Sequence, residues 1–302
     1  MFRAAALVLA AGLLVAGCGG SSSDVREEPA AGTLEALWRA PGDDVAIVPG
    51  TADFGPGRVR LSFLVIDDEG RVVTRPTARV WLARGLEEEP FAETTATAEP
   101  IGVEGSEDAD AEEIFVTHLE IDEPGTYWVL AEPVGGRKIQ AIGNVVVAEE
   151  PVAPAVGDPA IASETPTIES TGGDFDALTT QSPPDRELLE HSVADSLEAN
   201  VPFVLTFATP RYCQTRTCGP VVDVVDTVRE EYEAEGVRFI HVEIYEDNDP
   251  SKDTNEWVQE WNLPSEPFTF LVGADGLIKE RFEGTVSVRE LGAAVDQHLV
   301  GA

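Results

Sequence analysis

The residues best suited to covalent chemistry are two cysteines in the C-terminal third of the chain. Cys213 and Cys218 are separated by four residues, and the chain has three cysteines in all. A thiolate is the nucleophile of disulfide exchange, and a second thiol can resolve the mixed disulfide that forms. The pair therefore predicts either a redox-active dithiol or a structural disulfide.

The elements expected around the pair alternate between helix and strand, judged by apolar spacing and turn signals. Ser287 and Glu290 have the spacing of a capping box that opens the last helix. The expected helices are 186–199, 220–235, 254–261 and 287–300, and the expected strands are 202–208, 238–244, 268–272 and 277–283.

This order, with the cysteines in the loop after the first strand, resembles the thioredoxin fold over residues 185–302. The run Thr206–Cys213 resembles the family's strand leading to an aromatic residue and the first active-site cysteine. Cys218-Gly219-Pro220 resembles part of its redox motif, and Pro267 stands where the family has a cis-proline. The chain therefore resembles members of the thioredoxin-like superfamily.

The resemblance implies an α/β thioredoxin-like domain whose catalytic residues are Cys213 and Cys218. It also implies that Tyr212, Glu266 and Pro267 form the wall that binds the extended chain of a partner protein. No cofactor and no metal is expected for this chemistry.

Several residues depart from the family pattern. The spacing is Cys-x4-Cys, so either Cys213 attacks and Cys218 resolves, or Cys218 opens the motif and Cys213 lies upstream. Thr206 stands near the usual place of a buried Asp and cannot act as that base. Arg211 and Arg216 flank Cys213 and either favour its thiolate or are solvated loop residues.

The N-terminus resembles a bacterial lipoprotein. An uncharged apolar run from Ala4 to Ala16 ends at Val15-Ala16-Gly17-Cys18, which resembles a lipobox. The resemblance implies a signal peptide over residues 1–17, lipidation of Cys18 and a tether over residues 18–32. We therefore expect a chain anchored to the cell membrane on its extracytoplasmic face.

Between the tether and the predicted redox domain, the pattern is β. Short strands at regular spacing predict an immunoglobulin-like β-sandwich over residues 33–150. The segment 122–127 resembles an immunoglobulin turn in which Tyr127 ties a corner. The stretch 151–184 is rich in Pro, Ala, Thr and Ser, which predicts a linker before the domain 185–302.

Charge excludes one class of partner. With 56 acidic and 20 basic side chains, the chain has a formal net charge of −36, so the phosphates of nucleic acids would repel it.

Together these features predict a membrane-anchored thiol–disulfide oxidoreductase that acts on extracytoplasmic protein thiols or disulfides. Two alternatives stay open. One is a non-catalytic thioredoxin-like binding module in which Cys213 and Cys218 form a structural disulfide. The other is a Sco-type copper chaperone, although residues 262–287 contain no His for the distal ligand of that family.

Overall fold

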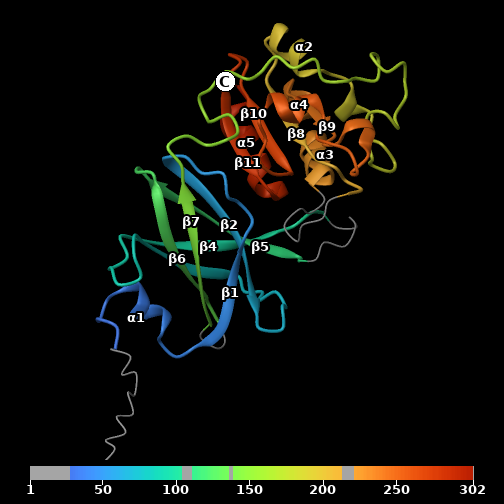
Figure 1. Cartoon of the computed structure of the whole chain (residues 1–302). Coiled ribbons are helices and arrows are strands. Elements are labelled where there is room, and N and C mark those ends of the chain that lie inside the picture. The colour runs from blue at the N-terminus through green and yellow to red at the C-terminus, as the bar shows by residue number, and fades with distance from the viewer. Residues whose placement is uncertain (1–27, 104–110, 136–138, 213–220, 302) are drawn as a thin grey trace, which may run out of the picture.

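The computed structural model describes residues 28–103, 111–135, 139–212 and 221–301. These residues form an N-terminal β-barrel and a C-terminal four-stranded sheet packed between helices (Figure 1). A short helix, α1 (Leu34–Trp38), lies at the end of the barrel that is remote from the C-terminal unit.

Seven strands close the barrel in the order β1-β2-β5-β4-β3-β6-β7. Strand β1 pairs antiparallel with β2 and parallel with β7, so it joins the two ends of the sheet. The strands are β1 (Asp43–Pro49), β2 (Gly57–Asp67), β3 (Thr77–Ala83), β4 (Ala92–Pro100), β5 (Glu113–Ile121), β6 (Gly125–Pro133) and β7 (Ile139–Val147).

The prediction of an immunoglobulin-like sandwich over 33–150 is wrong, because the sheet closes on itself. Inward and outward residues alternate in both architectures, so alternation cannot distinguish them. Tyr127 does tie a turn, since its hydroxyl donates to the carbonyl oxygen of Glu123 at 2.5 Å.

The C-terminal sheet has the order β11-β10-β8-β9. Strands β8 and β9 are parallel, whereas β10 is antiparallel to both β8 and β11. Its strands are β8 (Phe203–Phe207), β9 (Arg238–Val242), β10 (Phe268–Val272) and β11 (Ile278–Glu283).

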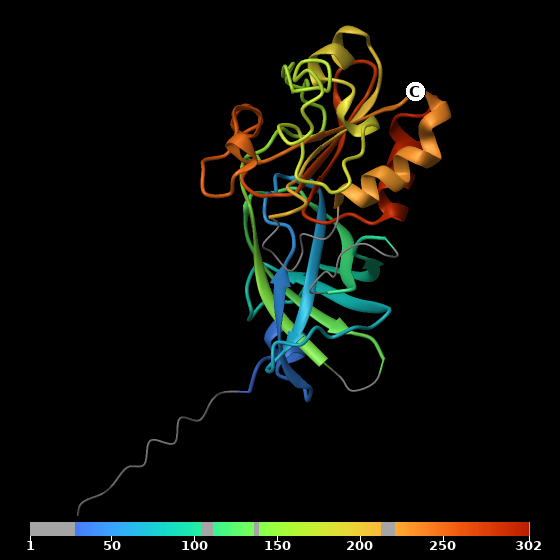
Figure 2. The ribbon, with the colours of Figure 1, turned by 90° about the vertical axis from the view of Figure 1, so that its right-hand side faces the viewer.

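Helices cover both faces of this sheet (Figure 2). Helices α3 (Val221–Tyr232) and α5 (Val288–His298) share a buried cluster with one face. Helices α2 (Val193–Glu198) and α4 (Glu256–Glu260) pack on the other, where Trp261 lies against Phe270. The expected capping box of α5 is confirmed, with the hydroxyl of Ser287 accepting from the N–H of Glu290 at 3.1 Å.

The prediction of an α/β thioredoxin-like domain over 185–302 is wrong. The chain is mostly β, with a closed seven-stranded barrel, a four-stranded sheet and, among the described residues, five short α-helices. The helix expected over 186–199 is divided into a 3-10 turn, η1 (Glu187–Leu189), and α2, because Ser192 caps a new helix start.

The oxidoreductase assignment therefore loses the support that it drew from fold resemblance. All three cysteines lie outside the described residues, and within the described ranges no disulfide is found.

The stretch 151–184, whose composition predicts a linker, lies along the C-terminal sheet. The N–H of Ile278 donates to the carbonyl of Asp158 at 2.9 Å, next to an isolated bridge between Pro159 and Leu277. The indole of Trp261 donates to the hydroxyl of Ser163 at 3.0 Å. This stretch therefore completes the surface of the C-terminal unit, while the domain boundary at residue 184 stays a prediction.

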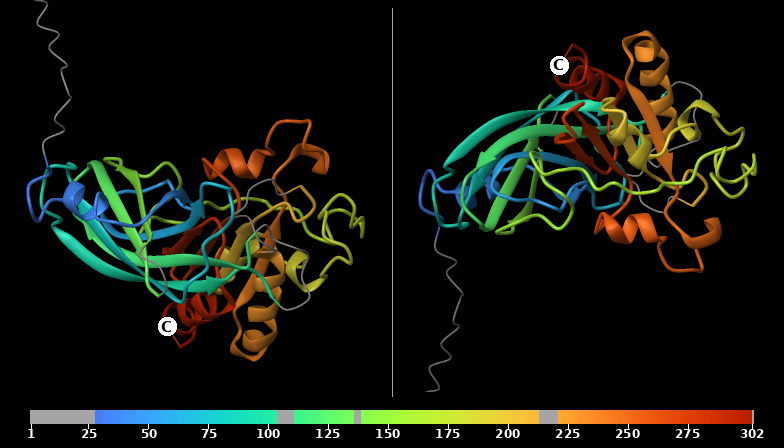
Figure 3. Two further views of the ribbon diagram at one scale, coloured as in Figure 1. Left: turned by 90° about the horizontal axis from the view of Figure 1, so that it is seen from below. Right: turned by 90° about the horizontal axis from the view of Figure 1, so that it is seen from above.

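Buried ion pairs join the barrel to the C-terminal unit, and the two lie against each other when seen from below and above (Figure 3). Arg60 of β2 donates two hydrogen bonds to Glu290 of α5, at 3.0 and 2.9 Å. Arg281 of β11 binds Asp53 at 2.6 Å. At Gly284, where φ is +72°, an added Cβ would collide with the carbonyl oxygen of Gly50. The two units thus share a close, polar interface.

Candidate functional site

The candidate site lies at the carboxyl ends of the parallel strands β8 and β9, beside the start of β10. At this edge Phe207 pairs with Phe268 on one side and Val242 on the other. The chain continues from β8 through Thr209 to Tyr212, the last described residue before the cysteine pair.

Of the residues expected at the site, Tyr212, Glu266 and Pro267 are described, whereas Cys213, Cys218 and Arg216 lie outside the described residues. Cys18, the expected lipidation site, also lies outside them. The described part of the site consists of the residues around Tyr212, the loop before β10 and the end of β9.

The loop before β10 is held from the end of β11. The Glu266–Pro267 bond is cis, as expected, and Pro267 is buried. The N–H of Gly284 donates to the carbonyl of Pro267 at 2.9 Å, and the hydroxyl of Ser265 donates to Glu283 at 2.7 Å. Two polar contacts on either side of Glu266 thus fix the course of this loop.

Glu266 is a carboxyl group placed to hold a proton. The hydroxyl of Tyr245 donates to its Oε1 at 3.1 Å. Burial raises the pKa of Glu266 above its ordinary value, and the nearby carboxylate of Glu243 adds to that rise. Burial and the charge of Glu266 in turn raise the pKa of Tyr245. The hydrogen bond from Tyr245 offsets part of this rise, and Glu266 holds its proton to a higher pH than an ordinary glutamate.

A chain of hydrogen bonds ties the segment before the cysteines to a second carboxylate. The N–H of Arg211 donates to the hydroxyl oxygen of Thr180 at 3.2 Å. That hydroxyl donates to Oε1 of Glu243 at 2.7 Å, and the N–H of Thr180 reaches the same oxygen at 2.5 Å. Glu243 is buried, and within the described ranges its Oε2 has no hydrogen-bond partner. Thr180 therefore links Glu243 to the backbone two residues before Cys213.

His241 has a structural role beneath the same edge. Its Nε2 lies 3.0 Å from the carbonyl oxygen of Ala208, and its Nδ1 lies 3.5 Å from the hydroxyl of Thr179. Because a carbonyl only accepts, Nε2 carries a hydrogen and donates it to Ala208. The ring thereby holds the first residue after β8 against β9.

Thr206 and Thr269 face each other across β8 and β10. Both are fully buried, and their hydroxyl oxygens are 3.1 Å apart. Neither hydroxyl exchanges a proton readily near neutral pH, so the pair cannot replace a carboxylate base.

The sequence reading did not identify Glu243, Tyr245 or Thr180 as members of the site. A signal exists for Glu243, because polar His241 and Glu243 alternate with apolar residues at the end of a buried strand. Thr180 could not be found in this way, since its contact with β9 joins residues far apart in the sequence. In the part of the chain that the structure describes, no three His, Cys, Asp or Glu side chains are grouped to hold a metal ion.

Comparison with known proteins adds no relative from which to interpret this site. No protein-family model matches the sequence, and no curated protein is significantly similar to it.

Proposed function

We propose that this protein carries out thiol–disulfide exchange with extracytoplasmic proteins through Cys213 and Cys218, while a lipid on Cys18 anchors it to the cell membrane. In the described ranges, no helix has the length and apolar character needed to cross a bilayer. Attachment in this proposal therefore rests on the sequence around Cys18.

The observation that carries the proposal is the position of the pair between β8 and α3. Cys218 precedes Val221, the first residue of α3, by three positions. The unpaired N–H groups at a helix N-terminus favour a thiolate over a thiol.

The exchange proceeds in two balanced steps. A thiolate of the pair attacks one sulfur of a partner disulfide, forming a mixed disulfide and releasing the other partner sulfur as a thiolate. The second cysteine, once deprotonated, attacks the mixed disulfide and releases the second partner thiolate. The pair ends oxidised and the partner reduced, and the reverse sequence oxidises a partner dithiol.

The two carboxyl groups supply the proton chemistry in this proposal. Glu266 or Glu243 accepts the proton of the resolving thiol, and the group returns it to a departing partner thiolate. Arg211, two residues before Cys213, is a positive charge that offsets the two carboxylates when both are ionised.

Insulin reduction by dithiothreitol tests the activity. We expect residues 18–302 carrying Cys18→Ser, hereafter the unlipidated chain, to accelerate the reaction catalytically, and Cys213→Ala to abolish that acceleration. Equal rates with and without the pair would refute the proposal and favour a structural disulfide. Substoichiometric copper retained by the reduced chain would favour the copper-chaperone alternative.

Trapping experiments test the order of attack. If Cys213 attacks first, Cys218→Ala accumulates mixed disulfides with partner proteins and Cys213→Ala does not. The opposite pattern would assign the attack to Cys218, the residue nearer to α3.

A further inference from the structure

A cleft of about 420 Å³ lies between the barrel and the C-terminal unit, on the far side of β11 from the sheet interior. The loop between β1 and β2, the start of β2 and His118 of β5 line it from the barrel. β11, the segment 151–156 and His298 of α5 line it from the other unit. This volume is in the range of pockets that bind small molecules, about 300–1,000 Å³.

Basic side chains gather in this cleft, although the chain as a whole is strongly acidic. Arg58, His118, Lys279 and His298 all line it, and they include two of the four histidines of the chain. With 56 acidic side chains against 20 Lys and Arg, such a group departs from the general character of the surface. The cleft thus offers an anion several basic side chains close together, which are sparse on the rest of this acidic protein.

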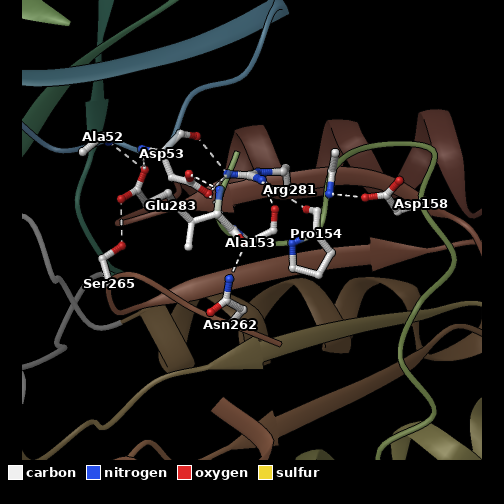
Figure 4. A network of polar contacts seen from close by, with 11 residues as sticks. Ala52, Asp53, Ala153, Pro154, Asp158, Asn262, Ser265, Arg281 and Glu283 are labelled. Carbon is white, nitrogen blue, oxygen red and sulfur yellow. Dashed lines mark hydrogen bonds and ion pairs between the residues drawn. The ribbon is translucent and has the colours of Figure 1, made fainter. Parts of the chain in front are cut away.

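The acidic side chains of the cleft are already engaged by donors of the protein (Figure 4). Asp53 accepts from the N–H groups of Val152 and Ala153, at 2.6 and 3.0 Å, and binds Arg281. Glu283 accepts from the N–H groups of Ala52 and Asp53, both at 2.7 Å, and from Ser265. These two carboxylates therefore hold the interface together, and the third that lines the cleft, Glu280, pairs with Arg58 at 3.8 Å.

Arg60, Lys279 and Arg281 are engaged by carboxylates at 2.6 to 2.9 Å. Arg58, His118 and His298 are the more available donors of the cleft. Among the described residues, no hydrogen bond is found for the imidazole of His118 or of His298, both of which line the cleft. Arg58 forms a long ion pair with Glu280, at 3.8 Å, and its side chain is 54% exposed, so its N–H groups remain accessible to a ligand. Desolvation lowers the pKa of His118, the charges of Arg58 and Arg60 lower it further, and the charge of Glu290 raises it, so His118 lies close enough to both guanidinium groups to feel their charge.

An apolar wall faces these donors. Phe54 and Val59 are buried at its base, Pro56 and Val156 lie at its rim, and Val156 is 55% exposed. An exposed valine in a cleft loses unfavourable contact with water when an apolar group covers it. The cleft therefore combines donors on one side with an apolar surface on the other.

We propose that this cleft binds a small amphiphilic carboxylate, with its head group at Arg58, His118 and His298 and its apolar part against Phe54 and Val156. This site is separate from the cysteine pair, and the proposal does not depend on thiol–disulfide exchange.

Calorimetric titration of the unlipidated chain with octanoate tests the proposal. We expect a dissociation constant below about 1 mM, and weakening by about tenfold in Arg58→Gln and in His118→Gln. The matched control is Arg71→Gln, since Arg71 is 70% exposed in the turn after β2 and does not line the cleft. This control should bind octanoate like the unaltered chain.

Two neutral or truncated probes make the test specific. Octanol, which lacks the carboxylate, and acetate, which lacks the apolar part, should each bind at least about tenfold more weakly than octanoate. Equal binding of either probe would overturn the recognition of an amphiphilic carboxylate. Undetectable octanoate binding at millimolar concentration, or an equal loss in Arg71→Gln, would overturn the site itself.

Discussion

Replacing Arg60 by Gln should destabilise the protein strongly, because it removes one partner of a buried ion pair between the two units. The side chains of Arg60 and Glu290 are 7% and 10% exposed, and the guanidinium also donates to the carbonyl of Thr285 at 3.0 Å. Breaking a buried pair from one side costs about 3–5 kcal/mol, since the remaining charge is left without its partner.

The expected loss lies near the lower end of that range. Glu290 also accepts from the N–H of Ser287 at the start of α5, so part of its stabilisation survives the loss of Arg60. We expect the free energy of unfolding to fall by about 3 kcal/mol.

Urea denaturation of the unlipidated chain at pH 7, followed by tryptophan fluorescence and circular dichroism, measures the change. Arg71→Gln is the matched control, because its exposed pair with Asp67 should contribute less than about 1 kcal/mol. A loss below about 1 kcal/mol in Arg60→Gln would refute the reasoning that this pair joins the barrel to the C-terminal unit.

Three further predictions concern packing, pH and anchoring. Gly284→Ala should lower the free energy of unfolding by about 1–3 kcal/mol in the same assay, because φ is +72° and a Cβ would strike Gly50; an unchanged value would contradict this contact. Burial, together with Asp185, raises the pKa of Asp226 in the folded state to about 6. Between about pH 4 and 6 the folded protein therefore binds more protons than the unfolded chain. The contribution of Asp226 to the free energy of unfolding falls as the pH rises through that window. Asp226→Asn should remove this fall in stability. If the variant and the unaltered chain show the same dependence of unfolding free energy on pH, this prediction is wrong. Cys18→Ser in the full chain should release the protein from the membrane fraction or leave an unprocessed precursor, whereas normal processing with membrane retention would exclude lipidation at this residue.

Local sequence signals predicted much of the C-terminal unit. The strand of residues 268–272, the hairpin that follows it and the capping box at Ser287 and Glu290 all depend on residues close together in the chain. Such contacts follow from apolar spacing, turn residues and cap residues. The same signals did not predict the helix break before Ser192. The apolar residues there keep helical spacing, but the side chain of Ser192 caps a new helix.

The features that the sequence did not predict depend on distant pairings. Barrel closure requires β1 to pair with β7, and residues 43–46 of β1 lie opposite residues 139–142. No local pattern distinguishes that pairing from two open sheets. The link from Thr180 to Glu243 is missed for the same reason, because a Thr in a Pro-rich stretch gives no sign of its partner.

The reduction potential of the Cys213–Cys218 pair tests the central claim most directly. The unlipidated chain would be equilibrated with graded ratios of reduced and oxidised glutathione, and of dithiothreitol for the more reducing potentials, and its free thiols counted by alkylation. Thiol–disulfide exchange predicts a reversible two-electron transition between about −270 and −120 mV, the range of catalytic dithiols. A pair that stays oxidised below about −300 mV would behave as a structural disulfide and would contradict the proposed function.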